Sequence, residues 1–248
     1  MTAKTHAQTS LSRGLDVLIA IARNGQTTVA ELADELGLAT STAYRYVRTL
    51  RDYGLIEESQ GVYLPGWRLM EISGQHLMHT RLAELGGDHL KTLTYQTSET
   101  AVLAVRAGSH AICLRQTVSP HTERHAFRIN ELLPLYAGAG QRVLLAHAPR
   151  PIVQIVTAGM IPHTLNTPDA DQLDGLLTAT RRDGFAVTRG EYQPGAVAVA
   201  VPVFAAGELA CSLTLAGPSS RCESNKWLQR AKRLLTSDAS RLGAELDS

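Results

Sequence analysis

The chain has 248 residues, with 24 lysines and arginines against 23 aspartates and glutamates, so its formal net charge is +1. This balance excludes a protein that coats nucleic acid through a general positive surplus, and an aromatic content of 5% disfavours a long stacking groove for single strands. The 44% of hydrophobic and 19% of charged residues indicate a globular protein of one large or two small domains. If the protein binds nucleic acid, it must therefore do so through a local surface rather than through its overall charge.

Targeting and redox features are sparse. There is no apolar run of about 18 residues, and the start MTAKTHAQTS lacks the apolar core of a signal peptide, so we expect a cytoplasmic protein without a membrane partner. Cys113, Cys211 and Cys222 form no Cys-x-x-Cys pair. We expect them to be buried and reduced, with neither a disulfide framework nor a cysteine zinc site.

The first predicted helix follows a polar start, residues 1–9, that we expect to be flexible. Leu15, Leu18, Ile19 and Ala22 have the spacing of one helix face, and Asn24-Gly25 ends the pattern. We therefore expect these four residues to face the core of a domain at residues 10–66.

A second and a third helix follow after a tight turn. Thr28 and Glu31 have the spacing of a capping box, and Gly37 ends the second helix. Only two residues separate Gly37 from Thr40, the expected N-cap of the third helix, so the two helices must meet at a sharp angle. The third helix is expected to end at Gly54.

The third helix combines an apolar face with a basic one. Ala43, Val47 and Leu50 are expected to face the core. The other side carries Ser41, Thr42, Tyr44, Arg45, Arg48 and Arg51. Three of the six basic residues in the first 66 positions thus share one sector of one helix. Arginine there can contact guanine in a major groove, whereas the alternative is an ordinary solvated face.

Two short β-prone runs, residues 55–56 and 62–64, predict a hairpin after the third helix. Three helices with a tight turn and then a hairpin follow the order of a winged helix-turn-helix. Residues 67–86 are expected to form a linker helix, which Gly86-Gly87 breaks or kinks.

Residues 87–248 are predicted to form a second domain in which antiparallel hairpins alternate with helices. The expected helices are 88–96, 140–148, 170–183 and 224–243, and the expected strands are 101–106, 111–117, 185–188, 197–204 and 209–215. This alternation indicates an α+β domain.

One loop in the second domain has the composition of a ligand site. Gly138-Ala139-Gly140 precedes a helix whose first N–H groups would suit an anion, although a plain tight turn explains the same residues. Val143 stands where a dinucleotide fingerprint needs its third glycine, so a nucleotide cofactor is not expected.

Catalytic signatures are missing from the sequence. His76 and His79, like His121 and His125, lack a His-Glu-x-x-His arrangement, and there is no Gly-x-Ser-x-Gly or Walker motif. Glu191 and Asp183 are most simply solvated loop carboxylates. We expect no catalytic residue, no metal and no cofactor. One alternative remains, a small-molecule-binding or catalytic module that ignores DNA. A protein adaptor would need an apolar patch on the third helix, whose face instead carries Ser, Thr, Tyr and Arg, so the sequence argues against it.

The two halves together resemble one family. Residues 15–64, with ELADELGLATSTAYRYVRTLRDYGLIEE at their centre, resemble the DNA-binding half of IclR-type bacterial transcription regulators. Three later segments resemble that family's second half, namely LLPLYAGAG at 132–140, DGFAVTRGEYQPGAVAVAVPVF at 183–204 and LTLAGPSSR at 213–221. The resemblance implies an α+β protein in which an N-terminal winged helix-turn-helix is joined by the linker helix to a GAF-like effector-binding domain.

The resemblance also implies partners and a mechanism. The protein would be a homodimer through its DNA-binding domains, or a dimer of dimers, on a palindromic operator in double-stranded DNA, and by analogy a repressor more than an activator. An effector in the second domain would reposition the linker helix and so change the spacing of paired recognition helices.

Site residues follow from matching positions. In that family the start of the third helix enters the major groove, which maps onto Thr40, Ser41, Thr42, Tyr44, Arg45 and Arg48. The wing, residues 57–63, would lie along the DNA backbone, and its two glutamates give it little affinity. The family's effector pocket maps onto His125, Leu133, Ala139, Gly140, Thr188, Ala198, Thr214 and Ala216.

The pocket departs from the family at several positions. Tyr136 stands where a histidine is usual, and some members place Asp, Cys and Ser where this chain has Thr188, Ala198, Thr214 and Ala216. We therefore expect a pocket poor in polar side chains. It would suit a small aromatic or otherwise apolar carboxylate, held by backbone amides near Ala139 and Gly140, rather than a two- or three-carbon keto acid.

Overall fold

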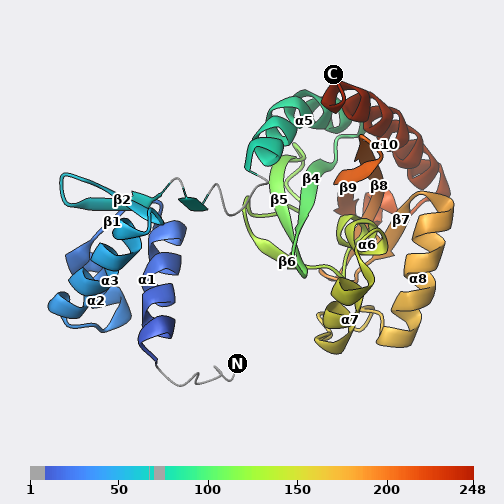
Figure 1. Cartoon of the computed structure of the whole chain (residues 1–248). Helices are drawn as coiled ribbons and strands as arrows, with labels where there is room; N and C mark the ends of the chain where they lie inside the picture. Colours follow the sequence, from blue (N-terminus) through green and yellow to red (C-terminus); the bar gives the residue numbers. More distant parts are fainter. Residues whose placement is uncertain (1–8, 67, 70–75) are drawn as a thin grey trace. The chain divides into compact units, whose positions relative to one another are not determined.

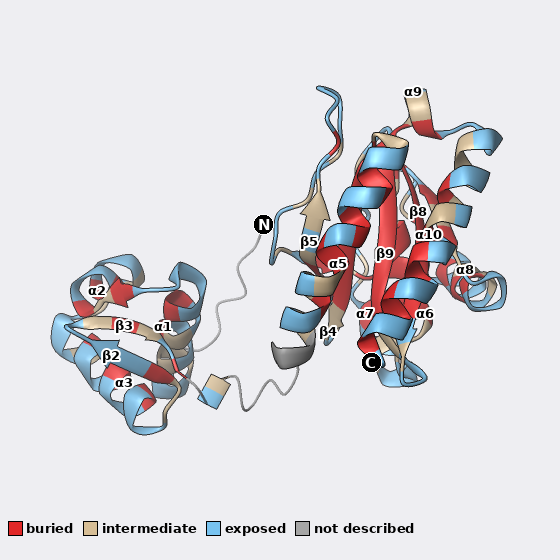
Figure 2. Cartoon of the chain, turned by 90° about the horizontal axis from the view of Figure 1, so that it is seen from above, coloured by how far each residue is buried: buried red, intermediate tan, exposed pale blue. Residues whose placement is uncertain are grey.

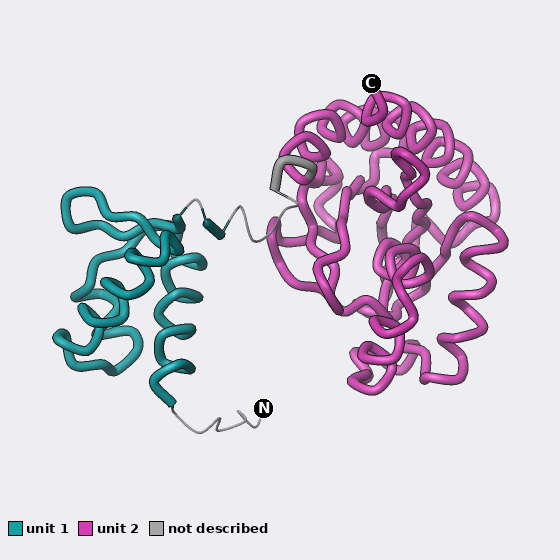
Figure 3. Tube along the Cα trace, in the orientation of Figure 1, with its two compact units in different colours: residues 1–77 teal, residues 78–248 magenta. Residues whose placement is uncertain are grey.

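The computed structural model describes residues 9–66, 68–69 and 76–248. Contacts divide the chain into two compact units, Met1–Leu77 and Met78–Ser248 (Figure 3). Residues 1–8 of the predicted flexible start, and residues 67 and 70–75 of the predicted linker helix, lie outside the described residues.

Within residues 9–66, unit 1 contains the three predicted helices and a small antiparallel sheet that includes the predicted hairpin. The helices are α1 (Ser10–Asn24), α2 (Val29–Leu36) and α3 (Thr40–Asp52); the strands β1 (Thr27–Thr28), β2 (Ile56–Ser59) and β3 (Val62–Pro65) lie in the order β1-β3-β2 (Figure 1). The capping box of Thr28 and Glu31 is present, and Gly37 ends α2 with a φ of 60°. Local side-chain chemistry therefore fixes both ends of α2.

The buried face of α1 is not the predicted one. Val17, Ala20 and Ile21 pack into the core of unit 1, whereas Leu11, Leu15 and Ile19 are 74%, 48% and 60% exposed. The helix carries apolar residues on two sides, so spacing alone could not show which side the other helices cover. The prediction that Leu15, Ile19 and Ala22 face the core is wrong. Leu11, Leu15 and Ile19, at positions i, i+4 and i+8, instead form an apolar stripe that unit 1 leaves exposed.

Unit 2 is built on one six-stranded antiparallel sheet in the order β6-β5-β4-β9-β8-β7. Its strands are β4 (Thr100–Ala107), β5 (His110–Thr117), β6 (Leu132–Pro134), β7 (Ala186–Arg189), β8 (Ala196–Ala205) and β9 (Glu208–Pro218). Its helices are α5 (His76–Thr97), α6 (Ala139–Ala146), α7 (Arg150–Ala158), α8 (Ala170–Asp183), α9 (Ser219–Cys222) and α10 (Asn225–Leu246). The predicted α+β class is confirmed.

The alternation of valine and alanine along β8 separates two packed layers. Val199, Val201 and Val203 belong to the cluster that α5 and α10 cover, while Ala198 and Ala200 pack with α6 on the opposite face. Figure 2 shows buried residues on the strands and on the inward sides of α5 and α10. Because alternate side chains of a strand point to opposite faces, valines fill one layer and alanines leave room in the other.

The glycine pair in α5 does not break the helix, contrary to the prediction. The helix runs unbroken from His76 to Thr97. A Cβ on Gly86 would collide with Leu103 Cδ1, and one on Gly87 would lie 2.8 Å from Arg115 Cζ. These glycines therefore let α5 approach the sheet closely, which is a packing role rather than a helix-ending one.

Two further expectations concern the cysteines and membrane spans. Cys113, Cys211 and Cys222 are free and buried, as predicted. Among the helices of the described residues, none is long and apolar enough to cross a membrane.

Candidate functional site

The first candidate surface is the start of α3 in unit 1. Ala39, not the predicted Thr40, is the N-cap of α3, and no side chain caps this end. Thr40 is the first helical residue, so its side chain does not take the capping position. The first N–H groups of α3 therefore receive no side-chain acceptor, and the end of the helix keeps its partial positive charge.

The predicted DNA-contacting side chains share one surface. Thr40, Ser41, Tyr44, Arg45 and Arg48 are exposed, and Thr42 is half-buried. A groove beside this face is lined by α3 and by Glu58 and Tyr63 of the hairpin. The Arg45 guanidinium lies 5.2 Å from the centre of the Tyr46 ring. Arg48 forms no ion pair within the described part of the chain.

Arg51, the third arginine of the stripe, is engaged within unit 1. Its guanidinium pairs with the Glu58 carboxylate on β2, with both side chains partly exposed. This pair cancels the charge of one wing glutamate and one arginine. The uncompensated positive charge of α3 therefore lies at Arg45 and Arg48, nearer the start of the helix.

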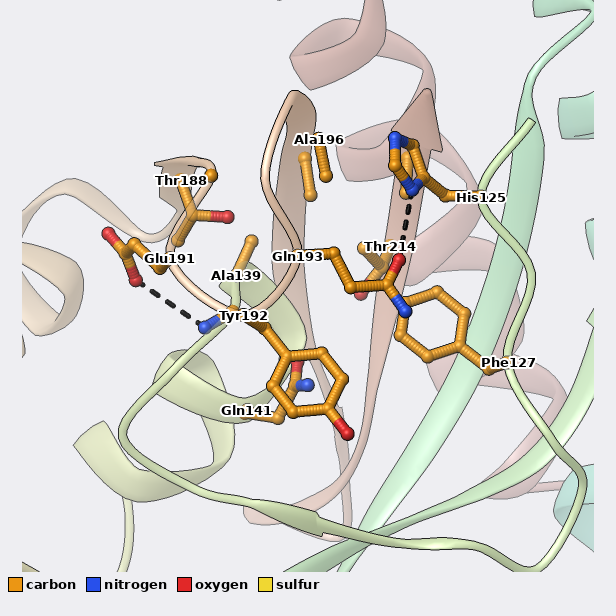
Figure 4. A pocket seen from close by; sticks show the side chains of 14 residues that line it. His125, Phe127, Ala139, Gln141, Thr188, Glu191, Tyr192, Gln193, Ala196 and Thr214 are labelled. Atoms are coloured by element: carbon orange, nitrogen blue, oxygen red, sulfur yellow. Dashed lines mark hydrogen bonds between the residues drawn. The ribbon is translucent and has the colours of Figure 1, made fainter. Parts of the chain in front are cut away.

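The second candidate site is a cavity on the alanine face of the unit 2 sheet (Figure 4). It holds about 410 Å³ of empty space, including the part open to solvent. The start of α6, the strands β7, β8 and β9, the segment after β5 and the 190–195 loop surround it. Its lining residues are His125, Phe127, Gly138, Ala139, Gln141, Thr188, Gly190, Glu191, Tyr192, Gln193, Ala196, Ala198, Thr214 and Ala216.

The structure brings most of the predicted effector residues together around this cavity. Six of them line it: His125, Ala139, Thr188, Ala198, Thr214 and Ala216. Leu133 does not, because it is buried in a neighbouring apolar cluster. Gly140 is also outside the lining; a Cβ there would lie 2.5 Å from Thr214 Oγ1, so this glycine allows α6 to reach the sheet.

The cavity has polar lining residues that the sequence did not predict. Gln141, Glu191 and Gln193 line it in addition to the two threonines. Three of the missed residues, Glu191 to Gln193, come from the loop between β7 and β8. The exposed wall of the cavity is nevertheless mostly apolar, which agrees with the expectation of a pocket poor in polar side chains. The signal for the polar loop residues was present in the EYQPG sequence, which begins three residues after the end of the predicted strand 185–188.

The sequence suggests that Glu191 is a solvated loop carboxylate, but the structure buries most of its side chain. Its side chain is 11% exposed and pairs with Arg142 of α6, whose side chain is 3% exposed. Arg142 also donates to the Val187 carbonyl at 3.2 Å, and Glu191 accepts from the Gly138 N–H at 3.4 Å. A buried pair thus ties the 190–195 loop to the start of α6. Asp183, by contrast, pairs with Arg182 near the surface.

Two aromatic and polar contacts complete the rim. His125 Nδ1 and Gln193 Oε1 lie 2.9 Å apart, which joins the segment after β5 to the 190–195 loop. The ring centres of Tyr192 and His163 lie 5.0 Å apart. Burial raises the pKa of Tyr192, so its hydroxyl stays protonated and available as a donor at neutral pH.

Comparisons with known proteins cover both units. Residues 10–60 match the family model of the IclR helix-turn-helix domain. Residues 74–243 match the family model of the bacterial transcriptional regulator IclR C-terminal domain. The transcriptional regulator BhcR of Paracoccus denitrificans is 30% identical over 222 residues, which cover 86% of this chain and 78% of that protein. The transcriptional repressor AllR of Escherichia coli is 23% identical, over 90% of this chain and 85% of that protein.

Solved structures share the fold of the whole chain. An IclR homologue of Microbacterium hydrocarbonoxydans, complexed with 4-hydroxybenzoate, has a TM-score of 0.74 at 23% identity and covers 96% of this chain and 99% of its own. The IclR of Thermotoga maritima has a TM-score of 0.64 at 23% identity, with the same coverage.

Proposed function

We infer the function of this chain from its family and its two sites: it belongs to the IclR family of bacterial transcriptional regulators. We propose that unit 1 binds a palindromic operator through α3, that the cavity of unit 2 binds a small organic acid, and that the acid changes operator affinity. Repression is the proposed direction, since several relatives are named as repressors. The proposal rests on one observation, namely that a single chain has both an exposed basic face on α3 and, in unit 2, a cavity lined by small, aromatic and polar residues.

The proposed DNA contact uses the surface at the start of α3. Thr40, Ser41 and Thr42 lie at an uncapped helix start, a position suited to phosphate oxygens. Arg45 and Arg48 follow at one-turn spacing, where guanidinium groups suit guanine edges. Tyr44 is 56% exposed and completes this surface.

We propose that two copies associate through α1. Leu11, Leu15 and Ile19 form an exposed apolar stripe on one side of that helix, whereas the opposite side is buried in the core of unit 1. A second copy would cover the same stripe with its own, which is the arrangement of a two-fold symmetric interface. The palindromic operator would then match the symmetry of the pair.

Replacing Ile19 with glutamate is expected to halve the assembly mass of the full chain. The charge would enter the centre of an apolar contact, where it costs more than the contact yields. Sedimentation velocity measures the mass, and Ala30→Glu, at an exposed alanine of α2, is the matched control. An unchanged mass for Ile19→Glu would show that α1 is not the interface.

The proposed effector is a small apolar acid, aromatic among the candidates. Alanines, Phe127 and Tyr192 form much of the cavity wall, and the start of α6 supplies N–H groups without a side-chain cap. A structural relative is complexed with 4-hydroxybenzoate, which is an aromatic acid of the proposed class. An aromatic ring would bury its faces against these small and aromatic side chains.

Two experiments test the proposal separately. Calorimetry with benzoate, 4-hydroxybenzoate, glyoxylate and pyruvate is expected to show binding of the aromatic acids; tight binding of only the keto acids would contradict the effector class. Selection of genomic fragments by the full chain, followed by footprinting, is expected to give a palindromic site. If no fragment is retained above a lysozyme control, the chain is a small-molecule-binding module without a DNA role.

A further inference from the structure

Two irregular segments border the cavity, and they are held in different ways. One is the 190–195 loop, and the other is a strap, residues 120–127, that follows β5. His125 and Phe127 of the strap line the cavity, whereas its other residues are exposed. The strap is therefore a single layer of chain between part of the cavity and solvent.

The 190–195 loop is fixed by a backbone hydrogen bond and by a buried charge pair. The Ser219 N–H donates to the Gly195 carbonyl at 2.8 Å, which joins the loop to the start of α9. The Glu191 carboxylate pairs with Arg142, whose side chain is 3% exposed. Moving this side of the cavity would separate a buried pair of charges, so the loop acts as the fixed wall.

The strap has no such backbone support. Among the residues that the structure describes, none forms a backbone–backbone hydrogen bond with residues 120–127. Side chains hold its two ends instead: the His121 N–H donates to Ser119 Oγ at 3.2 Å, and the Phe127 N–H donates to Gln116 Oε1 at 3.0 Å. The middle of the strap can therefore move between these ends without breaking the sheet.

Side-chain contacts also hold the middle of the strap in place. His125 Nδ1 lies 2.9 Å from Gln193 Oε1, which joins the strap to the fixed wall (Figure 4). Arg221 of α9 donates to the Glu123 carbonyl at 2.8 Å and, through its Nε, to Glu99 at 2.6 Å. Because Glu99 is 2% exposed, Arg221 ties the strap to a buried point of unit 2.

We propose that the strap is the gate of the cavity: its middle moves away from the 190–195 loop to admit the effector and closes when His125 meets Gln193 again. Gln193 and Arg221 are positioning residues that set the fraction of molecules with an open gate. The inference rests on the proposed function for its effector. Opening is nevertheless a property of the protein alone, so it can be measured without a ligand.

A thiol on the cavity wall reports how often the gate opens. Ala198 lines the cavity and is 9% exposed, so Ala198→Cys places the reporter there. Iodoacetamide alkylates this thiol in the full chain, and mass spectrometry measures its rate separately from that of the buried Cys211. In this background Gln193→Ala is expected to raise the rate roughly 2- to 12-fold, because the closed gate loses one hydrogen bond.

Three further variants define the cause of that change. Gln193→Glu keeps an oxygen acceptor for His125 and is expected to keep the rate of the reporter protein. Arg221→Lys keeps a charge beside Glu99 but loses the forked contact to Glu123, so it is expected to raise the rate. Gln154→Ala, at an exposed glutamine of α7, is the matched control and leaves the rate unchanged.

The outcomes separate the gate from the proposed function. An unchanged rate in Gln193→Ala or Arg221→Lys, equal rates in Gln193→Ala and Gln193→Glu, or no alkylation of the reporter in any variant would overturn the gate. So would an equal acceleration at Cys211, since unit 2 would then loosen as a whole. These results leave ligand binding standing, whereas failure of every acid to bind contradicts the effector class without changing the alkylation rates.

Discussion

Replacing Arg45 and Arg48 together with alanine is expected to lower operator affinity by at least roughly 30-fold, since each bidentate contact to guanine contributes about 1–3 kcal/mol. Both side chains are exposed on α3, and neither forms an ion pair with a residue that the structure describes. The substitution therefore removes recognition without exposing a buried partner. Fluorescence anisotropy with the footprinted operator measures the loss.

A control for this experiment exists in the same unit. Arg23 is an exposed arginine of α1, not of α3, and its guanidinium pairs with Glu35. Arg23→Ala changes the net charge of each chain by one unit, so it reports the general electrostatic effect on DNA binding. If Arg45→Ala/Arg48→Ala binds the operator no more weakly than Arg23→Ala, α3 does not read the DNA.

Replacing Glu191 with alanine is expected to destabilise unit 2 by about 3–5 kcal/mol, because it leaves the Arg142 charge buried without a partner. The Arg142 and Glu191 side chains are 3% and 11% exposed, so water cannot readily replace the lost carboxylate. The Arg142 Nε is already buried without a hydrogen-bond partner among the residues that the structure describes. The melting temperature of unit 2 is expected to fall by roughly 6–20 °C, measured by calorimetry.

The double variant Arg142→Met/Glu191→Met separates charge from packing. It removes both charges and keeps apolar volume on each side, so its stability is expected to lie close to that of wild type. A small effect of Glu191→Ala alone, below about 1 kcal/mol, would mean that Arg142 is hydrated and that the pair does not hold the 190–195 loop.

The sequence predicted those features that depend on neighbouring residues. The capping box of α2 and both ends of α8 follow from side chains within one or two turns, and they are confirmed. Which side of α1 is buried depends on the helices that cover it. Because α1 carries apolar residues on two sides, its sequence alone does not determine the buried side, and the predicted side is wrong. The Gly86-Gly87 pair reads as a helix end in isolation, but the sheet beneath it requires glycine.

In the cavity too, contacts between residues that are distant in the sequence could not be predicted. Thr188, Ala198 and Ala216 were placed on one surface by matching family positions, and strand register now shows that they share a face. Glu191 was misjudged because its partner, Arg142, lies 49 residues away in the chain. Spacing along the sequence carries no information about such a pair, and only the fold shows it.

We propose that one ligand site in unit 2 controls DNA binding by unit 1. The most direct test is to titrate wild-type protein onto its footprinted operator with and without a saturating acid that calorimetry shows to bind. Coupling of about 1–3 kcal/mol predicts a change in operator affinity of roughly 5- to 150-fold. An operator affinity that stays the same within twofold while the acid is bound would show that the ligand site does not control DNA binding.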